Sequence, residues 1–353
     1  MEVKDREDKD IRQPDLKSMN MEELRNWVIG AGQPAFRAKQ IYQWFHVKLA
    51  DGTEEMTNLP KSLREKMDEY GIYGVSVVTR LISEDDGTNK FLFRLHDGNV
   101  IESVLMKYKH GNSVCISSQV GCRMGCRFCA STIGGLVRNL TASEMLSQIY
   151  SIQKITGERV SNVVVMGTGE PLDNFDNVLR FLQLLSDPNG YGMSLRHVTV
   201  STCGVVPKIL ELAEPRLGLT LSVSLHCPND AGRSAIMPIN RSYPIDVLLD
   251  ACQTYFEKTG RRVTFEYAVM DQVNSAEQDA AALAERLKGL HAHVNLIPIN
   301  PVKERNFHTL KKTVLQFQKT LERYGIPATI RRTLGSDIEA ACGQLRRDAI
   351  QQT

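Results

Sequence analysis

From residue 110 onward, short apolar runs alternate with longer segments in which apolar residues recur every three or four positions. The apolar runs are rich in β-branched side chains and occur at 113–118, 162–166, 197–201, 219–225, 263–270 and 293–297. Segments with helical spacing separate most of them, at 142–156, 177–186 and 275–287. Apolar strands that alternate with helices are typical of a parallel sheet with right-handed crossovers. Because six strands are too few for a closed eight-stranded barrel, the pattern predicts an α/β fold, an open, partial (β/α)6 barrel.

The chain before residue 110 predicts a separate small domain. Asn20 and Glu23 have the spacing of a capping box at the start of a helix, and Pro60 suits the first turn of another helix. The first residues are polar, so we expect them to be flexible. The predicted order is a flexible N-terminus, a helical accessory domain, connecting strands, the barrel and a C-terminal segment, at residues 1–17, 18–75, 76–107, 108–335 and 336–353.

Composition adds few constraints. The content of 42% hydrophobic and 24% charged residues is ordinary for a globular protein, and no apolar run approaches the roughly 18 residues of a membrane helix. The charged N-terminus lacks the apolar segment of a secretory signal, so we expect a cytoplasmic protein. The net charge of +2 does not by itself indicate nucleic-acid binding. Basic residues do gather locally, at Lys107, Lys109, His110, Arg331, Arg332, Arg346 and Arg347.

Three of the eight cysteines, Cys122, Cys126 and Cys129, form a C-x3-C-x2-C array. Thiolates this close together can bind one metal centre, and Gly121 and Gly125 allow the tight turns that such binding requires. A cubane iron–sulfur cluster with three protein ligands keeps one iron open for substrate or cofactor. The alternative is a structural zinc site, but such sites usually use paired C-x2-C units, and the sequence has no second pair. The spacing therefore favours iron–sulfur over zinc.

The array, with Phe128 before its last cysteine, resembles the signature of radical S-adenosylmethionine (SAM) enzymes. The glycine-rich stretch at 167–171, after the second predicted strand, looks like the superfamily's SAM-binding motif. The resemblance implies a 4Fe-4S cluster whose open iron binds SAM and whose electron cleaves SAM to a radical. It also implies SAM contacts near the strand ends, where parallel α/β folds bind ligands, at Gly169, Glu170, Ser201, Ser224, Leu225, His226 and Asn300.

Longer motifs narrow the resemblance to the RlmN/Cfr family of RNA adenine methyltransferases. It extends from about residue 20 to 348 and is carried by motifs at 115–122, 138–141, 224–226, 237–240, 293–298 and 340–345. RlmN enzymes methylate C2 of an adenine in 23S rRNA and of the adenosine beside the anticodon in tRNA, whereas Cfr enzymes methylate C8 of that rRNA adenine. The resemblance implies both RNAs as partners, with an external flavodoxin- or ferredoxin-like electron donor. We expect the helical domain and the basic groups to bind RNA, no membrane partner, and a monomer.

Chemistry at adenine C2 demands two thiols outside the cluster. C2 is electron-poor, so a thiolate first takes a methyl group from one SAM, and a radical from a second SAM then activates it. The methylated base stays bound to sulfur until a second thiol releases it through a disulfide. By resemblance, Cys342 carries the methyl group, Cys115 is the resolving thiol and Glu102 is the proton acceptor. The remaining cysteines are assigned to structure: Cys203, Cys227 and Cys252.

The RlmN branch is favoured by residues 130–132, 170–171 and 297–300, where Cfr-like sequences differ. No physical property of these residues selects C2 over C8, so this choice rests on pattern alone. Two alternatives stay open. One is Cfr-like C8 methylation, and the other, in a different functional class, is a zinc-containing RNA-binding module.

Overall fold

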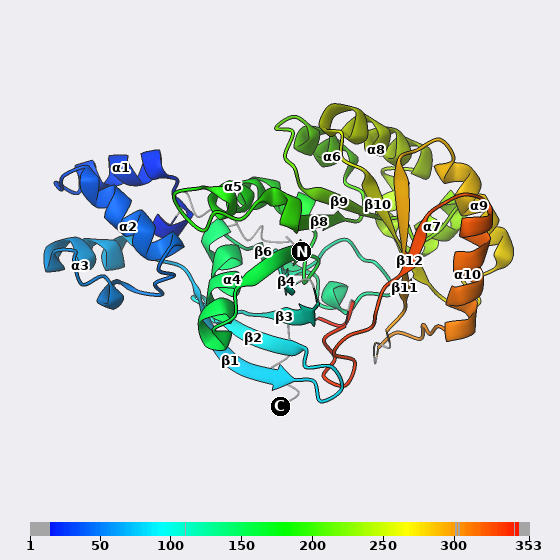
Figure 1. Ribbon diagram of the computed structural model, residues 1–353, viewed down its shortest axis with the longest axis horizontal. Coiled ribbons are helices and arrows are strands. Elements are labelled where there is room, and N and C mark those ends of the chain that lie inside the picture. The colour runs from blue at the N-terminus through cyan, green and yellow to red at the C-terminus, as the bar shows by residue number, and fades with distance from the viewer. Residues whose placement is uncertain (1–14, 110, 301, 303, 342, 346–353) are drawn as a thin grey trace, which may run out of the picture.

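The computed structural model describes residues 15–109, 111–300, 302, 304–341 and 343–345. Within these ranges, a ten-stranded sheet runs in the order β1-β2-β3-β4-β7-β8-β9-β10-β11-β12 (Figure 1). A two-stranded antiparallel sheet, β5 (Gln119–Gly121) with β6 (Leu136–Asn139), accompanies it. The mixed α/β architecture predicted from the apolar pattern is therefore confirmed.

The parallel strands form the partial barrel. They are β4 (Gly111–Ile116), β7 (Val160–Val165), β8 (Val198–Thr202), β9 (Thr220–Ser224), β10 (Val263–Val269), β11 (Ala292–Pro298) and β12 (Ala328–Ile330). The first six match the predicted strands. The pattern missed β12 because this strand has only three residues, of which the middle one, Thr329, is exposed.

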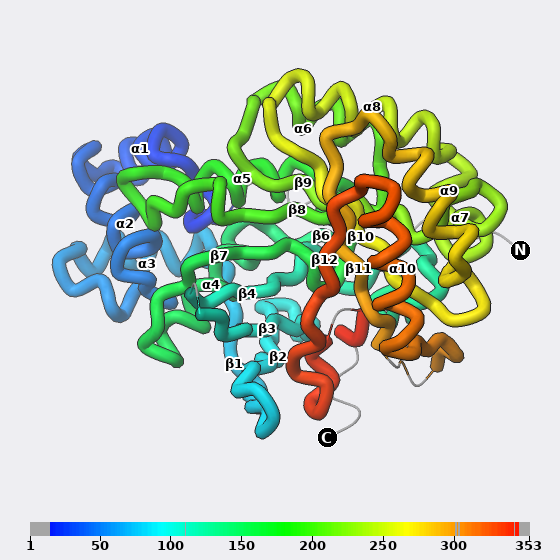
Figure 2. The backbone as a smooth tube through the Cα atoms, turned by 45° about the vertical axis from the view of Figure 1, so that its right-hand side comes forward, coloured from blue at the N-terminus to red at the C-terminus, as the bar shows by residue number. Residues whose placement is uncertain are grey.

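Helices lie along the outer side of the parallel strands (Figure 2). They are α4 (Ala142–Thr156), α5 (Phe175–Ser186), α6 (Val206–Ala213), α8 (Ile245–Thr259), α9 (Glu277–Leu287) and α10 (Lys311–Arg323). In α5, Val178, Phe181 and Leu185 recur at helical spacing and are buried, so one face packs on the sheet. None of the described helices is both long and apolar enough to cross a membrane.

The strands expected at 76–107 belong to the main sheet. They are β1 (Val75–Ile82), β2 (Asn89–Leu95) and β3 (Val100–Tyr108), and they pair in antiparallel fashion up to β4. In this register Val104 of β3 lies opposite Cys115 of β4. The segment between the helical domain and the barrel therefore forms one wall of the region around Cys115.

The N-terminal part is helical, as predicted. It contains η1 (Leu16–Ser18), α1 (Met21–Gly30), α2 (Phe36–His46), η2 (Thr53–Glu55) and α3 (Lys61–Tyr70). The capping box is confirmed, because the Asn20 side chain accepts from the backbone N–H of Glu23 at 2.9 Å and the Asn20 N–H donates to the Glu23 carboxylate at 2.8 Å. Pro60 lies directly before α3 rather than in its first turn.

The predicted flexible N-terminus, residues 1–17, reaches too far, because Asp15 and the two residues after it are buried. Asp15 Oδ2 accepts hydrogen bonds from the hydroxyls of Ser18, at 2.7 Å, and Ser143, at 2.8 Å. Ser143 lies at the start of α4, so its hydrogen bond to Asp15 connects the helical domain to the barrel. Local polarity could not reveal this contact because its partner is more than a hundred residues away.

Candidate active site

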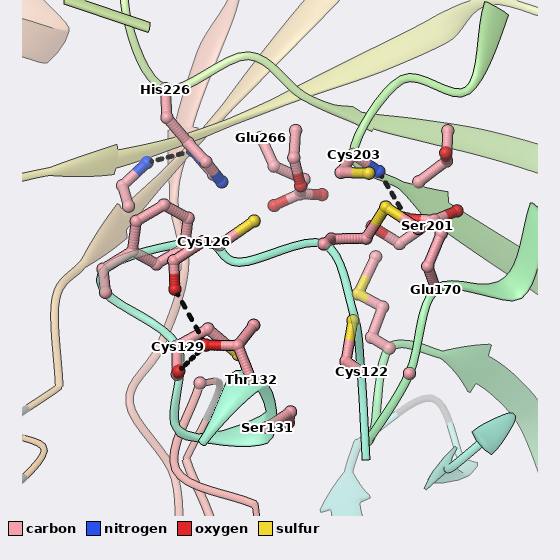
Figure 3. Close-up of a pocket in the computed structure, with 18 of the residues that line it drawn as sticks. Cys122, Cys126, Cys129, Ser131, Thr132, Glu170, Ser201, Cys203, His226 and Glu266 are labelled. Carbon is pink, nitrogen blue, oxygen red and sulfur yellow. Dashed lines mark hydrogen bonds between the residues drawn. The ribbon is translucent and has the colours of Figure 1, made fainter. Parts of the chain in front are cut away.

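A pocket opens at the carboxyl ends of the parallel strands, where the sequence predicts the SAM contacts (Figure 3). The pocket contains about 1040 Å³ that is not occupied by protein atoms, part of which is open to solvent. Most of the site residues predicted from the sequence line it. They are Cys122, Cys126, Cys129, Gly169, Glu170, Ser201, Ser224, His226 and Asn300.

The loop between β5 and η3 (Ala130–Thr132) forms a tight curve that carries the three cysteines. Gly121 has a φ of 78°, and a Cβ there would lie 2.0 Å from the carbonyl oxygen of Gly135, so only glycine fits. The Thr132 hydroxyl lies 2.9 Å from the carbonyl oxygen of Cys129 and 3.2 Å from that of Cys126 (Figure 3). The loop is therefore shaped by its own backbone and presents its thiols to one space.

The three thiols fit a metal cluster better than a single ion. All of them line the same pocket. Structural zinc sites are almost always closed by four protein ligands, whereas a 4Fe-4S cluster with three cysteines keeps one iron open. A zinc ion needs its ligands within about 2.3 Å of one point, whereas each cysteine of a 4Fe-4S cluster binds a different iron. The arrangement suits a cluster held by Cys122, Cys126 and Cys129.

Burial controls the protonation of these thiols. It raises the pKa of Cys122 to about 12 and that of Cys126 well above its ordinary value. Both are therefore protonated in the apoprotein at neutral pH. Metals bind thiolates, so cluster assembly has to displace these protons and weakens as the pH falls.

The glycine-rich loop after β7 packs backbone against backbone on the region around β4 and β5. A Cβ at Gly167 would lie 2.7 Å from the carbonyl oxygen of Ile116. Gly169 has a φ of 113°, and a Cβ there would lie 2.7 Å from that of Gln119. Glycine is required at both positions, and the close approach brings a stretch of main chain to the pocket wall.

Glu170 uses its carboxylate to connect two loops. Oε1 accepts from the backbone N–H of Leu172 at 3.0 Å, at the start of η4 (Pro171–Asn174), and Oε2 accepts from that of Cys203 at 2.7 Å (Figure 3). Burial raises the pKa of this carboxyl group despite these bonds. The side chain thus joins the loops after β7 and β8, and a contact from Glu170 to SAM stays a prediction.

His226 is a neutral histidine in the pocket wall. It has a φ of 58°, and its ring stands perpendicular to that of Phe128, with 4.8 Å between ring centroids. Its Nδ1 lies 2.9 Å from the backbone nitrogen of Ala268 (Figure 3). Burial lowers its pKa to about 3. Since Nδ1 accepts the Ala268 N–H, the single proton of the neutral ring is on Nε2, which makes that atom a donor.

Leu225 is the predicted SAM contact that the structure does not bring to the pocket. Its side chain is fully buried in the hydrophobic core. Its N–H donates to the carbonyl oxygen of Glu266 at 3.0 Å, and its own carbonyl accepts from Arg233 at 3.1 Å. Any contact of Leu225 with SAM would therefore use its backbone.

Sequence reasoning missed Glu266, which lies in the middle of β10, lines the pocket and is only 3% exposed. Ser222 Oγ lies 3.1 Å from its Oε1, and Asn295 donates to Oε2 at 2.9 Å. Burial raises its pKa. Its position as the one carboxylate in the apolar strand β10 could have marked it as a candidate site residue. Cys203, assigned to structure from the sequence, also lines the pocket.

A second, smaller pocket adjoins the first and is lined by Cys115. Cys342 lies outside the described residues. Its neighbours are described: Ala341 lines the pocket of Cys115, and Gly343 lines the pocket of the cluster cysteines. The C-terminal segment therefore borders both pockets. Both are also lined by Met166, Ile297, Asn300, Arg331 and Leu345.

Glu102, the predicted proton acceptor, is completely buried on β3. Lys90 Nζ lies 2.7 Å from its Oε1. It does not line either of these pockets of the described chain. Its role as proton acceptor therefore stays a prediction: Glu102 lies one strand from Cys115 but does not line its pocket.

Comparison with known proteins identifies the family. Residues 116–284 match the radical SAM superfamily, and residues 14–72 match the ribosomal RNA large subunit methyltransferase N-terminal domain. A probable dual-specificity RNA methyltransferase RlmN from Lachnospira eligens is 56% identical over 334 residues, covering 94% of this chain and 95% of that protein. This chain belongs to the RlmN family.

A second RlmN relative, from Clostridium perfringens, is 52% identical over 338 residues, which cover 95% of this chain and 97% of that protein. The solved structure of a radical SAM methyltransferase from Sphaerobacter thermophilus is 42% identical and superposes with a TM-score of 0.91, covering 95% of this chain and all of the other. RlmN membership confirms the radical SAM methyltransferase class, with a 4Fe-4S cluster and SAM as its cofactors. It also decides against the zinc-containing RNA-binding module.

Proposed function

We propose that this RlmN-family enzyme forms 2-methyladenine in 23S rRNA and in tRNA beside the anticodon. Its relatives carry the description dual-specificity RNA methyltransferase, which supports two RNA substrates. The observation that supports the proposed chemistry is that the two pockets adjoin. The cluster cysteines line one pocket and Cys115 lines the other, while the residues on either side of Cys342 each line one of them.

The proposed mechanism divides the work between two thiols. The Cys342 thiolate attacks the methyl group of one SAM and displaces S-adenosylhomocysteine, forming a C–S bond on the protein. When bound, the 4Fe-4S cluster supplies the electron whose transfer to a second SAM generates the radical. The radical removes a hydrogen atom from the S-methyl group, the resulting methylene radical adds to adenine C2, and the C2 proton and one electron, returned to the oxidised cluster, are then lost. The Cys115 thiolate attacks the Cys342 sulfur, which forms a disulfide, breaks the bond from that sulfur to the methylene carbon and leaves this carbon on the base as a methyl group once it is protonated. Glu102 is the proposed proton acceptor, one strand away from Cys115.

The proposed SAM site is the wall of the larger pocket. His226 offers its Nε2–H, the serines offer hydroxyls and the glycine-rich loop offers backbone groups, which together can bind carboxylate, ribose and adenine. Phe128 and the neighbouring methionines provide apolar surface that excludes water. The assigned contacts are Gly169, Glu170, Ser201, Ser224, Leu225, His226 and Asn300, with Leu225 acting through its backbone.

RNA binding is assigned to the helical domain and to basic groups near the pockets. Arg331 is the best placed of the described candidates because it lines both pockets. Lys107 is less well placed because it forms a salt bridge with Glu158, with 2.6 Å between Nζ and Oε1. His110, Arg346 and Arg347 lie outside the described residues. If Arg331 contacts a phosphate, Arg331→Gln should reduce the slope of binding against salt by about one, and an unchanged slope contradicts the assignment.

Three further assignments belong to this proposal. A flavodoxin- or ferredoxin-like protein supplies the electron, the enzyme acts as a monomer, and its location is cytoplasmic. The described cysteines form no disulfide with one another, as is usual in a reducing compartment. Absorbance changes on mixing the holoenzyme with reduced donor test the first assignment, and sedimentation tests the second. Fractionation of cells tests the third.

The decisive experiment is nucleoside mass spectrometry of rRNA and tRNA from cells with and without this protein. The proposal expects 2-methyladenosine in both RNAs only when the protein is present. If 8-methyladenosine is the sole product, the enzyme has Cfr-like regiochemistry. If neither RNA changes, the proposed substrates are wrong.

A further inference from the structure

Arg233 on α7 (Asp230–Ile236) is a completely buried cation, with 0% exposure, behind the wall of the cluster pocket. Its guanidinium donates four hydrogen bonds, and every acceptor is an uncharged oxygen. They are the carbonyl oxygens of Leu225 at 3.1 Å, Cys203 at 2.7 Å and Ser224 at 3.0 Å, and Oδ1 of Asn240 at 2.9 Å. These bonds fix the guanidinium at the ends of β8 and β9 but do not neutralise its charge.

No carboxylate in the described part of the chain lies within 4.0 Å of this guanidinium. Asp230 is separated from it by Asn240, whose Nδ2 donates to Asp230 Oδ1 at 2.9 Å. Burial lowers the pKa of Arg233. Cys203, whose carbonyl oxygen accepts from Arg233 at 2.7 Å, lines the cluster pocket. A buried cation without a paired anion is strongly unfavourable. The site therefore calls for an anion in the cluster pocket, which Cys203 and Ser224 line.

The segment that carries Arg233 also contacts the cluster loop directly. The backbone N–H of Arg127 donates to the carbonyl oxygen of Ile236 at 2.9 Å. Pro238, in η6 (Pro238–Arg241), packs against Gly125, where an added Cβ would lie 3.4 Å from its Cγ. These contacts give the 237–240 motif a structural explanation, because its last residue, Asn240, orients Arg233. One rigid element thus positions both the loop and the cation.

We propose that Arg233 is the fixed counter-charge of the iron–sulfur cluster and raises its reduction potential. The inference rests on the cluster ligands assigned above, Cys122, Cys126 and Cys129. A 4Fe-4S core with three thiolates is anionic, and it gains another negative charge when it is reduced. A cation held nearby in a low-dielectric interior stabilises the reduced state more than the oxidised state. Arg233 is thus a positioning residue for electron transfer, with no contact to substrate required.

The test is the midpoint potential of the reconstituted holoenzyme, measured by a redox titration followed by electron paramagnetic resonance. Arg233→Gln should lower the equilibrium constant for reduction at least tenfold, which is 59 mV for a one-electron couple. Arg233→Lys keeps the charge and should stay closer to the wild-type potential. Asn240→Ala is the matched control, because it removes one hydrogen bond of Arg233 but leaves its charge.

A second variant covers the case in which Arg233→Gln does not load a cluster. The double substitution Asp230→Asn with Asn240→Asp moves the carboxylate into contact with Arg233 without changing net charge. It should lower the potential in the same direction as Arg233→Gln. An unchanged potential in a fully loaded Arg233→Gln or double variant, or an equal shift in Asn240→Ala, overturns the inference. A wild-type protein that binds no iron–sulfur cluster instead overturns the proposed function itself.

Discussion

The two adjoining pockets are built in different ways. The cluster pocket surrounds a short loop that is shaped by glycines and by hydrogen bonds from the Thr132 hydroxyl to its backbone carbonyls. The Cys115 pocket is an apolar contact between β3, β4 and the C-terminal segment, in which Cys115 packs with Val104, Met106, Leu334, Ala340 and Leu345. In the proposed mechanism, radical formation takes place at a loop shaped mainly by its own glycines and supported by the segment of Ile236 and Pro238, whereas thiol exchange depends on packing between β3, β4 and the C-terminal segment. The two halves of the chemistry should consequently be separable by mutation.

Loss of a cluster ligand should have the largest effect. Cys126→Ala should reduce bound iron and SAM cleavage to background, because the other two thiols lose a partner that lines the same pocket. Iron analysis and the release of 5′-deoxyadenosine measure the two effects. Cys252→Ala is the control, since Cys252 is also buried but belongs to the main hydrophobic core. SAM cleavage that persists in Cys126→Ala contradicts the ligand assignment.

Cys115→Ala should separate the chemistry of the two pockets, because SAM cleavage should continue while turnover falls. Iron content and SAM cleavage should stay within about twofold of wild type, but turnover should fall about 100-fold or more because the tethered product is not released. A protein–RNA adduct should therefore accumulate and migrate as a shifted band on a denaturing gel. The expectation fails if free methylated RNA forms at the wild-type rate, or if the substitution also removes the iron.

Two glycines on either side of the cluster loop, Gly121 and Gly135, provide a finer test of its rigidity. Gly121→Ala places a methyl group against the carbonyl of Gly135 and should lower the free energy of unfolding by about 3 kcal/mol. Gly135→Ala has a similar positive φ of 69° but no atom within 4 Å, so it should cost only about 1 kcal/mol. Urea unfolding and iron content measure the difference. Equal losses would mean that the tight contact does not shape the loop.

The contrast between the pockets also explains what the sequence could predict. The ligands Cys122, Cys126 and Cys129 lie within one local spacing, and their pocket is at the strand ends where parallel folds bind ligands. The Cys115 pocket depends on the β3–β4 register and on a segment more than two hundred residues away. The sequence pattern alone therefore gave Cys115 no role, and only the family resemblance predicted one. Glu266 was missed for the same reason, because its hydrogen-bond partners come from neighbouring strands.

His226 should give the smallest effect, because its ring should contribute no pH dependence to SAM affinity. Burial lowers its pKa to about 3, so its ring stays neutral between pH 8 and pH 5.5 and keeps accepting the Ala268 N–H. A histidine with an ordinary pKa would be about 90% protonated at pH 5.5 and would lose this bond. The ratio of the SAM dissociation constants at the two pH values should therefore be the same, within about twofold, in wild type and in His226→Gln. A ratio that differs between them shows that the ring titrates in this range.

The stability of the fold should respond to the protonation of His226, even though its contribution to SAM affinity does not change with pH. The unfolded chain protonates His226 near pH 6.5, while the folded protein does so only near pH 3, so the unfolded state binds more protons between these values. The free energy of unfolding therefore falls as the pH decreases below 6.5, by about 1.4 kcal/mol at pH 5.5 for this one residue. Urea midpoints should show a shallower decline in His226→Gln, and parallel declines would contradict the buried, neutral ring. A flat binding ratio together with a falling midpoint would place the acid sensitivity of this pocket in folding and not in ligand recognition.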